Sequence, residues 1–169
     1  MFIFKFSFYQ IIEIIRVYIV RLRNNYFVFK KFRIILSEGR IINNSANIIL
    51  GLKFRMAPNC QLIAQGQVGD AQISIGGNVA LNMNVIINAD CGGRIIIGND
   101  VMIGPNTVMR ASNHKFNNLY ESIINQGHVP GEIHIEDDVW IGANVSIVPN
   151  VRIGKSSVIG AGSVVCSNI

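Results

Sequence analysis

The stretch IHIEDDVWIGANVSIVPNVRIGKSSVIGAGSVV, residues 133–165, repeats an aliphatic residue at every sixth position. The repeated residues are Ile135, Ile141, Ile147, Ile153, Ile159 and Val165. A period of six does not fit an amphipathic α-helix, whose apolar stripe recurs about every 3.6 residues. It fits short extended segments that are each followed by a bend.

Two earlier blocks carry the same period, namely Ile75, Leu81, Ile87 and then Ile97, Ile103, Met109. Three such segments make one triangular coil, and successive coils can stack at about 4.8 Å, the spacing of neighbouring strands. The repeated aliphatic side chains then form a continuous core, while glycine and asparagine at the bends supply positive φ angles. The pattern therefore predicts an all-β fold, a left-handed parallel β-helix of six-residue repeats.

Two interruptions of the period carry further information. Ile97 follows Ile87 by ten positions in place of six, which predicts four extra residues at a corner around Cys91 to Arg94. The 26 residues from Met109 to Ile135 predict a loop, residues 110–134, that leaves the prism and returns. Loops of that length in compact domains are usually functional or disordered. Before Ile75 the period weakens, so we expect irregular opening coils over residues 40–74 of a β-helix domain that spans residues 40–169.

Residues 1–39 form a basic, apolar N-terminal segment, in which residues 9–24 have the pattern of an amphipathic helix. Residues 1–33 carry seven basic residues against the single acid Glu13, so this segment accounts for the chain's net charge of +5 and the rest is close to neutral. Two roles remain open for this segment: packing against the prism or a neighbouring subunit, or peripheral contact with an anionic inner membrane. Because the basic residues belong to an apolar segment, we do not expect nucleic acid binding.

Composition favours a cytoplasmic protein. Charged residues interrupt every apolar run before it reaches the roughly 20 residues of a membrane-spanning helix, and the N-terminus lacks a signal-peptide cleavage site. The three cysteines, Cys60, Cys91 and Cys166, are far apart and without metal-ligand spacing, so we expect reduced thiols. The histidines also lack paired spacing, so no metal site is predicted.

His114 is the leading candidate for chemistry, because it stands where the chain leaves the coil for the long loop. A histidine near neutral pH can accept a proton from a hydroxyl group during nucleophilic attack. The other two histidines are predicted to be solvated, with His134 pointing outward between Ile133 and Ile135.

The run GPNTVMRASNHKF, residues 104–116, together with residues 133–165 resembles the bacterial hexapeptide-repeat acetyltransferases. The nearest branch is similar to galactoside, maltose and virginiamycin-type acetyltransferases and to O-acetyltransferases of capsule and O-antigen synthesis. The resemblance covers residues 75–166. It implies acetyl-CoA as co-substrate, bound in a groove between two prisms of a homotrimer, and direct attack by the acceptor hydroxyl with a loop histidine as general base.

The resemblance also assigns site residues. The catalytic histidine falls on His114, and acceptor-contacting residues fall on Asn82, Asp90 and Trp140. Small residues that let the pantetheine approach the coil fall on Gly104, Gly142, Ala143, Gly160 and Ala161. Without the family, Asn82 reads as a bend residue, Asp90 as a solvated corner and Trp140 as packing between subunits.

We therefore expect an acetyl-CoA-dependent O-acetyltransferase that acts on a sugar hydroxyl of a surface polysaccharide or its precursor. One alternative is an N-acetyltransferase of a nucleotide-linked amino sugar, although such enzymes usually carry an extra N-terminal α/β domain. The other is a non-catalytic β-helix that serves as an assembly platform. The run after Val165 departs from the family, whose basic C-terminal tail helps to hold the CoA nucleotide, so we expect weakened CoA affinity.

Overall fold

The computed structural model describes residues 41–43, 47–65 and 71–169. The segment predicted over residues 1–39, with its helix and its membrane contact, lies outside these residues.

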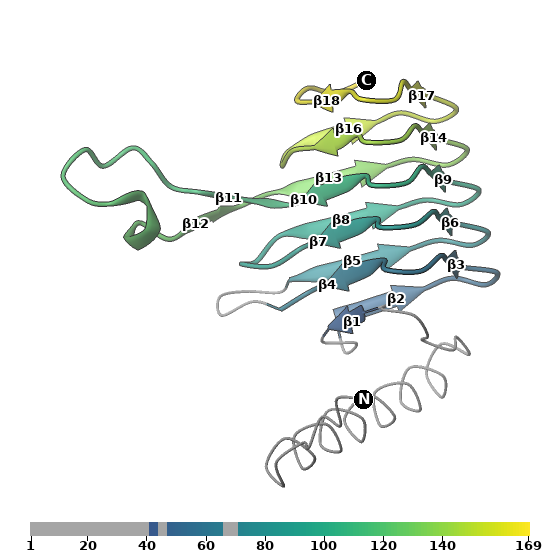
Figure 1. Cartoon of the computed structure of the whole chain (residues 1–169), viewed down its shortest axis with the longest axis horizontal. Coiled ribbons are helices and arrows are strands. Elements are labelled where there is room, and N and C mark those ends of the chain that lie inside the picture. Colours follow the sequence, from purple (N-terminus) through teal and green to yellow (C-terminus); the bar gives the residue numbers. More distant parts are fainter. Residues whose placement is uncertain (1–40, 44–46, 66–70) are drawn as a thin grey trace, which may run out of the picture. The chain divides into compact units, whose positions relative to one another are not determined.

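Short strands form three parallel sheets that wrap around one core, and this confirms the predicted left-handed parallel β-helix (Figure 1). Sheet A contains β1 (Ile41–Asn43), β4 (Gln61–Ile63), β7 (Ile86–Asn88), β10 (Val108–Arg110), β15 (Ser146–Ile147) and β18 (Val164–Val165). Sheet B contains β2 (Ile48–Leu50), β5 (Gln72–Ile75), β8 (Arg94–Ile97), β13 (Glu132–Ile135) and β16 (Val151–Ile153). Sheet C contains β3 (Arg55–Met56), β6 (Ala80–Leu81), β9 (Met102–Ile103), β14 (Trp140–Ile141) and β17 (Val158–Ile159). The chain passes from sheet B to C to A in each coil, and we name the three edges the BC, CA and AB corners.

All twelve aliphatic residues of the six-residue pattern are buried in the prism, and the most exposed, Ile159, is 5% exposed. Most residues two positions earlier are buried as well, including Val79, Val101 and Val139. Thr107 and Ser112 are the buried polar residues among those described. The period of six therefore specifies the core directly, because every strand turns the same side chain inward.

The CA corner is fixed by a ladder of asparagines. Asn84, Asn106 and Asn144 have φ angles of 61°, 59° and 56°, a left-handed conformation that asparagine tolerates better than branched residues. The side-chain amide of Asn84 donates to Oδ1 of Asn106 over 2.9 Å, and that of Asn106 donates to Oδ1 of Asn144 over 3.0 Å. One residue type thus supplies both the bend and a bond between coils.

In every long coil the extra residues come between a strand of sheet A and the next strand of sheet B, at the AB corner. Stacked residues are 18 apart for Glu132 and Asn150, but 22 apart for Asn84 and Asn106 and 38 apart for Asn106 and Asn144. The excess lies between β7 and β8 and between β10 and β13, as predicted. A third excess lies between β4 and β5, because Gln65 and Asp90 are 25 apart.

The expectation of irregular opening coils over residues 40–74 is wrong for the described residues. Strands β2, β3 and β4 stack in register on β5, β6 and β7, and Ile48, Phe54, Cys60 and Leu62 are buried in the common core. The apparent slip in the sequence period comes from the excess between β4 and β5, which shifts the count without disturbing the coil.

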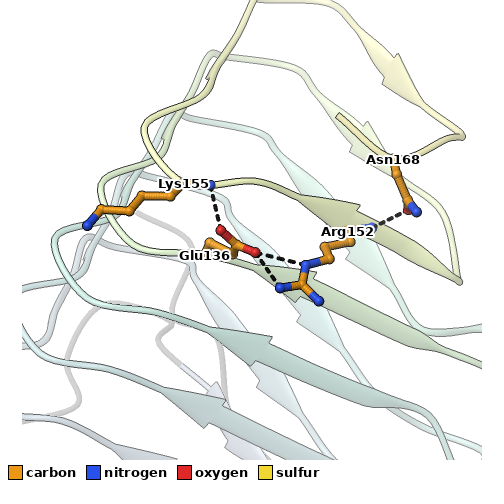
Figure 2. Close-up of polar contacts among 4 residues, drawn as sticks. All are labelled: Glu136, Arg152, Lys155 and Asn168. Atoms are coloured by element: carbon orange, nitrogen blue, oxygen red, sulfur yellow. Dashed lines mark hydrogen bonds and ion pairs between the residues drawn. The ribbon is translucent and has the colours of Figure 1, made fainter.

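At the BC corner after β13, Glu136 occupies the position that glycine occupies in neighbouring coils, and Figure 2 shows its polar contacts. Its carboxylate accepts bonds from Arg152 Nε (2.8 Å), Arg152 Nη2 (2.5 Å) and the Lys155 backbone N–H (2.8 Å). These bonds, chiefly that of Arg152, lower the pKa of Glu136 from its usual value. The Arg152 backbone N–H in turn donates to Oδ1 of Asn168 over 2.8 Å, so the last described residues are tied to this coil.

The long loop is partly ordered as a hairpin. Strands β11 (Ser112–His114) and β12 (His128–Pro130) pair antiparallel and project away from the stacked coils, as Figure 1 shows in green. A short 3-10 turn, η2 (Ile123–Asn125), follows near the tip. The Gln126 side chain bonds the Asn118 backbone and the Glu121 carbonyl oxygen, which gives the tip a defined conformation.

Candidate functional site

His114 ends β11 directly opposite His128 on β12. Backbone bonds from Lys115 N–H to Gly127 O (3.0 Å) and from Gly131 N–H to Ala111 O (2.8 Å) flank this pair. The alternation of an antiparallel ladder therefore makes it a pair without direct backbone bonds, where side chains approach most closely. The two imidazole rings lie 4.1 Å apart between centroids, with their planes at 41°.

His128 was predicted to be solvated, and the structure instead makes it the neighbour of the candidate base. Its pKa is lowered from 6.5, first by partial burial and then by the charges of His114 and Arg110. A lowered pKa means that the His128 imidazole stays neutral at a more acid pH than a free histidine. The two paired strands have only three residues each, and the two histidines are 14 positions apart in the sequence. Strands this short cannot be paired from the sequence.

The other face of the hairpin borders a cleft of about 380 Å³. Asn113, Lys115 and Val129 alternate with the imidazoles along the strands, and they line the cleft together with Pro149 and Asn150 of the next coil. His114 also borders it. The hairpin thus borders a mostly apolar recess, and His114 both lines this recess and belongs to the imidazole pair.

Asp90 lies at the AB corner, the same corner from which the hairpin leaves. Its Oδ1 accepts the Gln65 backbone N–H at 2.6 Å, and its own N–H donates to Oδ1 of Asn88 at 2.8 Å. Half of the carboxylate therefore holds two coils together. If Asp90 binds the acceptor, as the resemblance implies, its Oδ2 is the atom available for that contact.

The remaining predicted residues gather at the CA corner. Asn82, Gly104, Gly142 and Gly160 form one column, linked by backbone bonds from Asn82 N–H to Ile103 O, Gly104 N–H to Ile141 O and Gly142 N–H to Ile159 O. Ala143 and Ala161 follow them in the chain. The Asn82 Oδ1 accepts the Met83 N–H at 2.8 Å, so its side-chain nitrogen is the group that can donate to a ligand.

Trp140 lies on the outer face of sheet C beside this corner. It pairs with Met102 on one side and Val158 on the other, and the three side chains are 53%, 55% and 64% exposed. They form an apolar stripe that the single chain leaves uncovered.

The glycines of the CA column have a packing reason of their own. A Cβ on Gly104 would lie 2.6 Å from the Gly142 carbonyl carbon, and a Cβ on Gly142 would lie 2.6 Å from the Ala161 nitrogen. At Gly160 the nearest atom would be Ser163 Oγ at 3.8 Å, which is ordinary contact. Close stacking of coils therefore explains Gly104 and Gly142, but it does not explain Gly160.

The predicted site residues thus fall into two groups within one chain. His114 and Asp90 lie at the AB corner, where the strands of sheet A end. Asn82 and the small residues lie at the CA corner, where these strands begin. The structure thus assigns the two groups to different corners of the prism.

Across residues 47–65 and 71–169 no cluster of histidine, cysteine or acidic side chains could hold a metal ion. Nor does any helix in the described part of the chain have the length and apolarity to cross a membrane.

Residues 132–167 match the family described as bacterial transferase hexapeptide (six repeats). The galactoside O-acetyltransferase of Lactococcus lactis is 36% identical over 102 residues, 60% of this chain and 47% of that protein. A solved hexapeptide-repeat acetyltransferase from Vibrio cholerae is 33% identical, with a TM-score of 0.59 over 74% of this chain and 66% of that chain.

A Bacillus cereus N-acyltransferase, solved with dTDP-4-amino-4,6-dideoxyglucose and coenzyme A, has a TM-score of 0.67 at 22% identity. The match covers 80% of this chain and 71% of the N-acyltransferase chain, and at this identity it shows a common fold alone. The chain spans about half the length of the curated relatives it matches.

Proposed function

Because this chain belongs to the hexapeptide-repeat transferase family, we propose that it is an acetyl-CoA-dependent O-acetyltransferase acting on a sugar hydroxyl. The acceptor is a surface polysaccharide or its precursor. The observation that carries the proposal is the exposed His114 imidazole at the root of the hairpin. Relatives named galactoside O-acetyltransferase support the reaction type.

His114 acts as the general base. As the acceptor oxygen attacks the thioester carbonyl of acetyl-CoA, the imidazole takes the hydroxyl proton and a C–O bond forms. The tetrahedral intermediate then collapses, the C–S bond breaks, and the imidazolium returns the proton to the departing thiolate. A sugar hydroxyl is a weak nucleophile, so this proton transfer gives a rate advantage of typically 10²–10⁴-fold.

The site is assembled between copies of the chain in a homotrimer. His114 at the AB corner of one copy meets Asn82 and the small-residue column at the CA corner of the next, which a single chain keeps apart. Small residues in that column let the pantetheine reach backbone N–H and C=O groups, and one such N–H can stabilise the oxyanion. The apolar stripe of Met102, Trp140 and Val158 would be covered in the same assembly.

Release of free CoA from acetyl-CoA, measured with a panel of neutral sugars, acidic sugars and amino sugars, tests the proposal. We expect acetyl esters on hydroxyl groups and loss of turnover in His114→Ala. His134→Ala, on the outer face of sheet B, is the matched control and should retain activity. Transfer only to amino groups would favour an N-acyltransferase, and no acetyl-CoA binding at all would leave the non-catalytic platform.

A further inference from the structure

A permanently charged group lies near the imidazole pair. Arg110 ends β10 four residues before His114, and its charge reaches His128, whose pKa it helps to lower. Its backbone pairs with Asn88 in the coil below, and its side chain is half-buried. The root of the hairpin thus carries one permanent positive charge, on Arg110. Two imidazoles that can each take up a proton, those of His114 and His128, accompany it.

In the described part of the chain, no carboxylate forms an ion pair with these three groups. The guanidinium of Arg110 has no hydrogen bond or ion pair with any described residue. By contrast, Arg94 lies 3.7 Å from Glu132 and Arg152 binds Glu136 directly. The acid at this corner, Asp90, already accepts the Gln65 N–H. A half-buried arginine without a partner loses hydration and gains nothing from the fold itself.

Ser112 adds an independent observation. It lies two residues before His114, so the alternation of the strand puts both side chains on one face of β11. Its hydroxyl is fully buried and has no hydrogen-bond partner among the described residues. Buried hydroxyl groups are nearly always bonded, so one left open at this position indicates a polar ligand nearby.

We propose that the acceptor carries an acidic group, a carboxylate or a phosphate, close to the hydroxyl that is acetylated, and that Arg110 binds this group. The inference rests on the proposed function and names the class of its acceptor as an acidic sugar. Arginine suits the task because its planar fork makes paired, charge-assisted bonds to carboxylate and phosphate oxygens. His128 supplies a further donor on the same side of the hairpin. Lys115 lies on the opposite face and takes no part.

The test compares matched acceptors in the purified full chain with acetyl-CoA: glucuronate against glucose, galacturonate against galactose, and glucose 6-phosphate as the phosphate arm. The wild type should use the acidic member of a pair with a kcat/KM about tenfold to a hundredfold higher. Arg110→Gln should abolish this preference by raising KM for the acidic member of each pair. Arg152→Gln, which removes the same charge from the outer face of sheet B, should keep the preference.

A second measurement needs no turnover. Titration of the His128 ring by NMR should show a higher pKa when glucuronate or inorganic phosphate binds, and Arg110→Gln should remove that response. Transfer to sugars without any acidic preference would overturn this inference and leave the proposed function intact. Absence of transfer to every sugar, with acetyl-CoA unbound, would instead overturn the proposed function. If Arg110→Gln still prefers acidic acceptors, Arg110 is not the group that binds the carboxylate or phosphate.

Discussion

The Thr107 hydroxyl donates a 3.0 Å hydrogen bond to the carbonyl oxygen of Gly142 inside the prism. The Thr107 hydroxyl oxygen also accepts the Val145 N–H at 3.3 Å, so the CA corner is held from within by one buried side chain. Thr107→Val keeps the shape of the side chain but leaves the Gly142 carbonyl oxygen and the Val145 N–H without this hydrogen-bond partner. We predict a loss of about 1–3 kcal/mol in the free energy of unfolding, measured by urea denaturation.

Thr107→Ser is the control, because it retains the hydroxyl and removes only a methyl group. It should lose less stability than Thr107→Val. The reverse order would mean that packing of the methyl group, and not the hydrogen bonds, is the contribution of Thr107.

The second prediction separates packing from cofactor binding at the CA corner. Gly142→Ala places a Cβ 2.6 Å from the Ala161 nitrogen and should cost about 1–3 kcal/mol of stability. Gly160→Ala meets nothing closer than 3.8 Å and should leave stability unchanged. Both should weaken acetyl-CoA binding in calorimetry. Normal binding by Gly160→Ala would remove Gly160 from the proposed pantetheine groove.

The fold could be predicted from the sequence because each coil repeats one physical requirement. An inward aliphatic residue such as Ile141 is followed by a residue small enough for the next coil, such as Gly142, and then by a bend residue such as Asn144. Short-range patterning therefore specifies the core, and even the extra residues appear as breaks in the count. The opening coils were misjudged because an excess between β4 and β5 moved the count while the coil continued.

The site could be predicted only in part. His114 is a candidate because it breaks the repeat, whereas the corner glycines are candidates only through the resemblance to a family. The pairing of His114 with His128 depends on the register of a hairpin, which no periodicity encodes. The isolation of Arg110 is likewise invisible in sequence, since it depends on which carboxylates fold nearby and what they already bind.

The third prediction concerns the transfer step. His114→Ala should lower kcat by about 10²–10⁴-fold, because the imidazole acts in the transition state, while the Kd for acetyl-CoA should change little. Asn82→Ala should raise KM for the acceptor instead. Near-normal turnover in His114→Ala, or an acetylated protein trapped without acceptor, would contradict direct attack.

The fourth prediction is a pH effect on the imidazole pair. His128 should titrate by NMR below the ordinary histidine value of about 6.5. Its folded pKa lies below its unfolded value, so the unfolded chain binds the proton more readily and stability decreases as pH falls from about 6.5 through the lowered pKa. His114→Gln removes one of the charges responsible and should raise the His128 pKa. Lys115→Gln, on the other face, should not. An unshifted His128 in the wild type would mean that the rings do not meet in solution.

The last prediction asks whether two copies of the chain share each site. Mixed trimers of His114→Ala and Asn82→Ala chains contain one interface in which an intact AB corner faces an intact CA corner. At an acceptor concentration far below the raised KM of Asn82→Ala, both parents turn over slowly, and random equal mixing should restore about a quarter of wild-type activity. A chain carrying both substitutions, mixed with His114→Ala, has no intact interface and is the control for recovery by refolding alone. If the mixture shows only the mean activity of its parents, each site lies within one chain, and Asn82 does not meet the acceptor that His114 deprotonates.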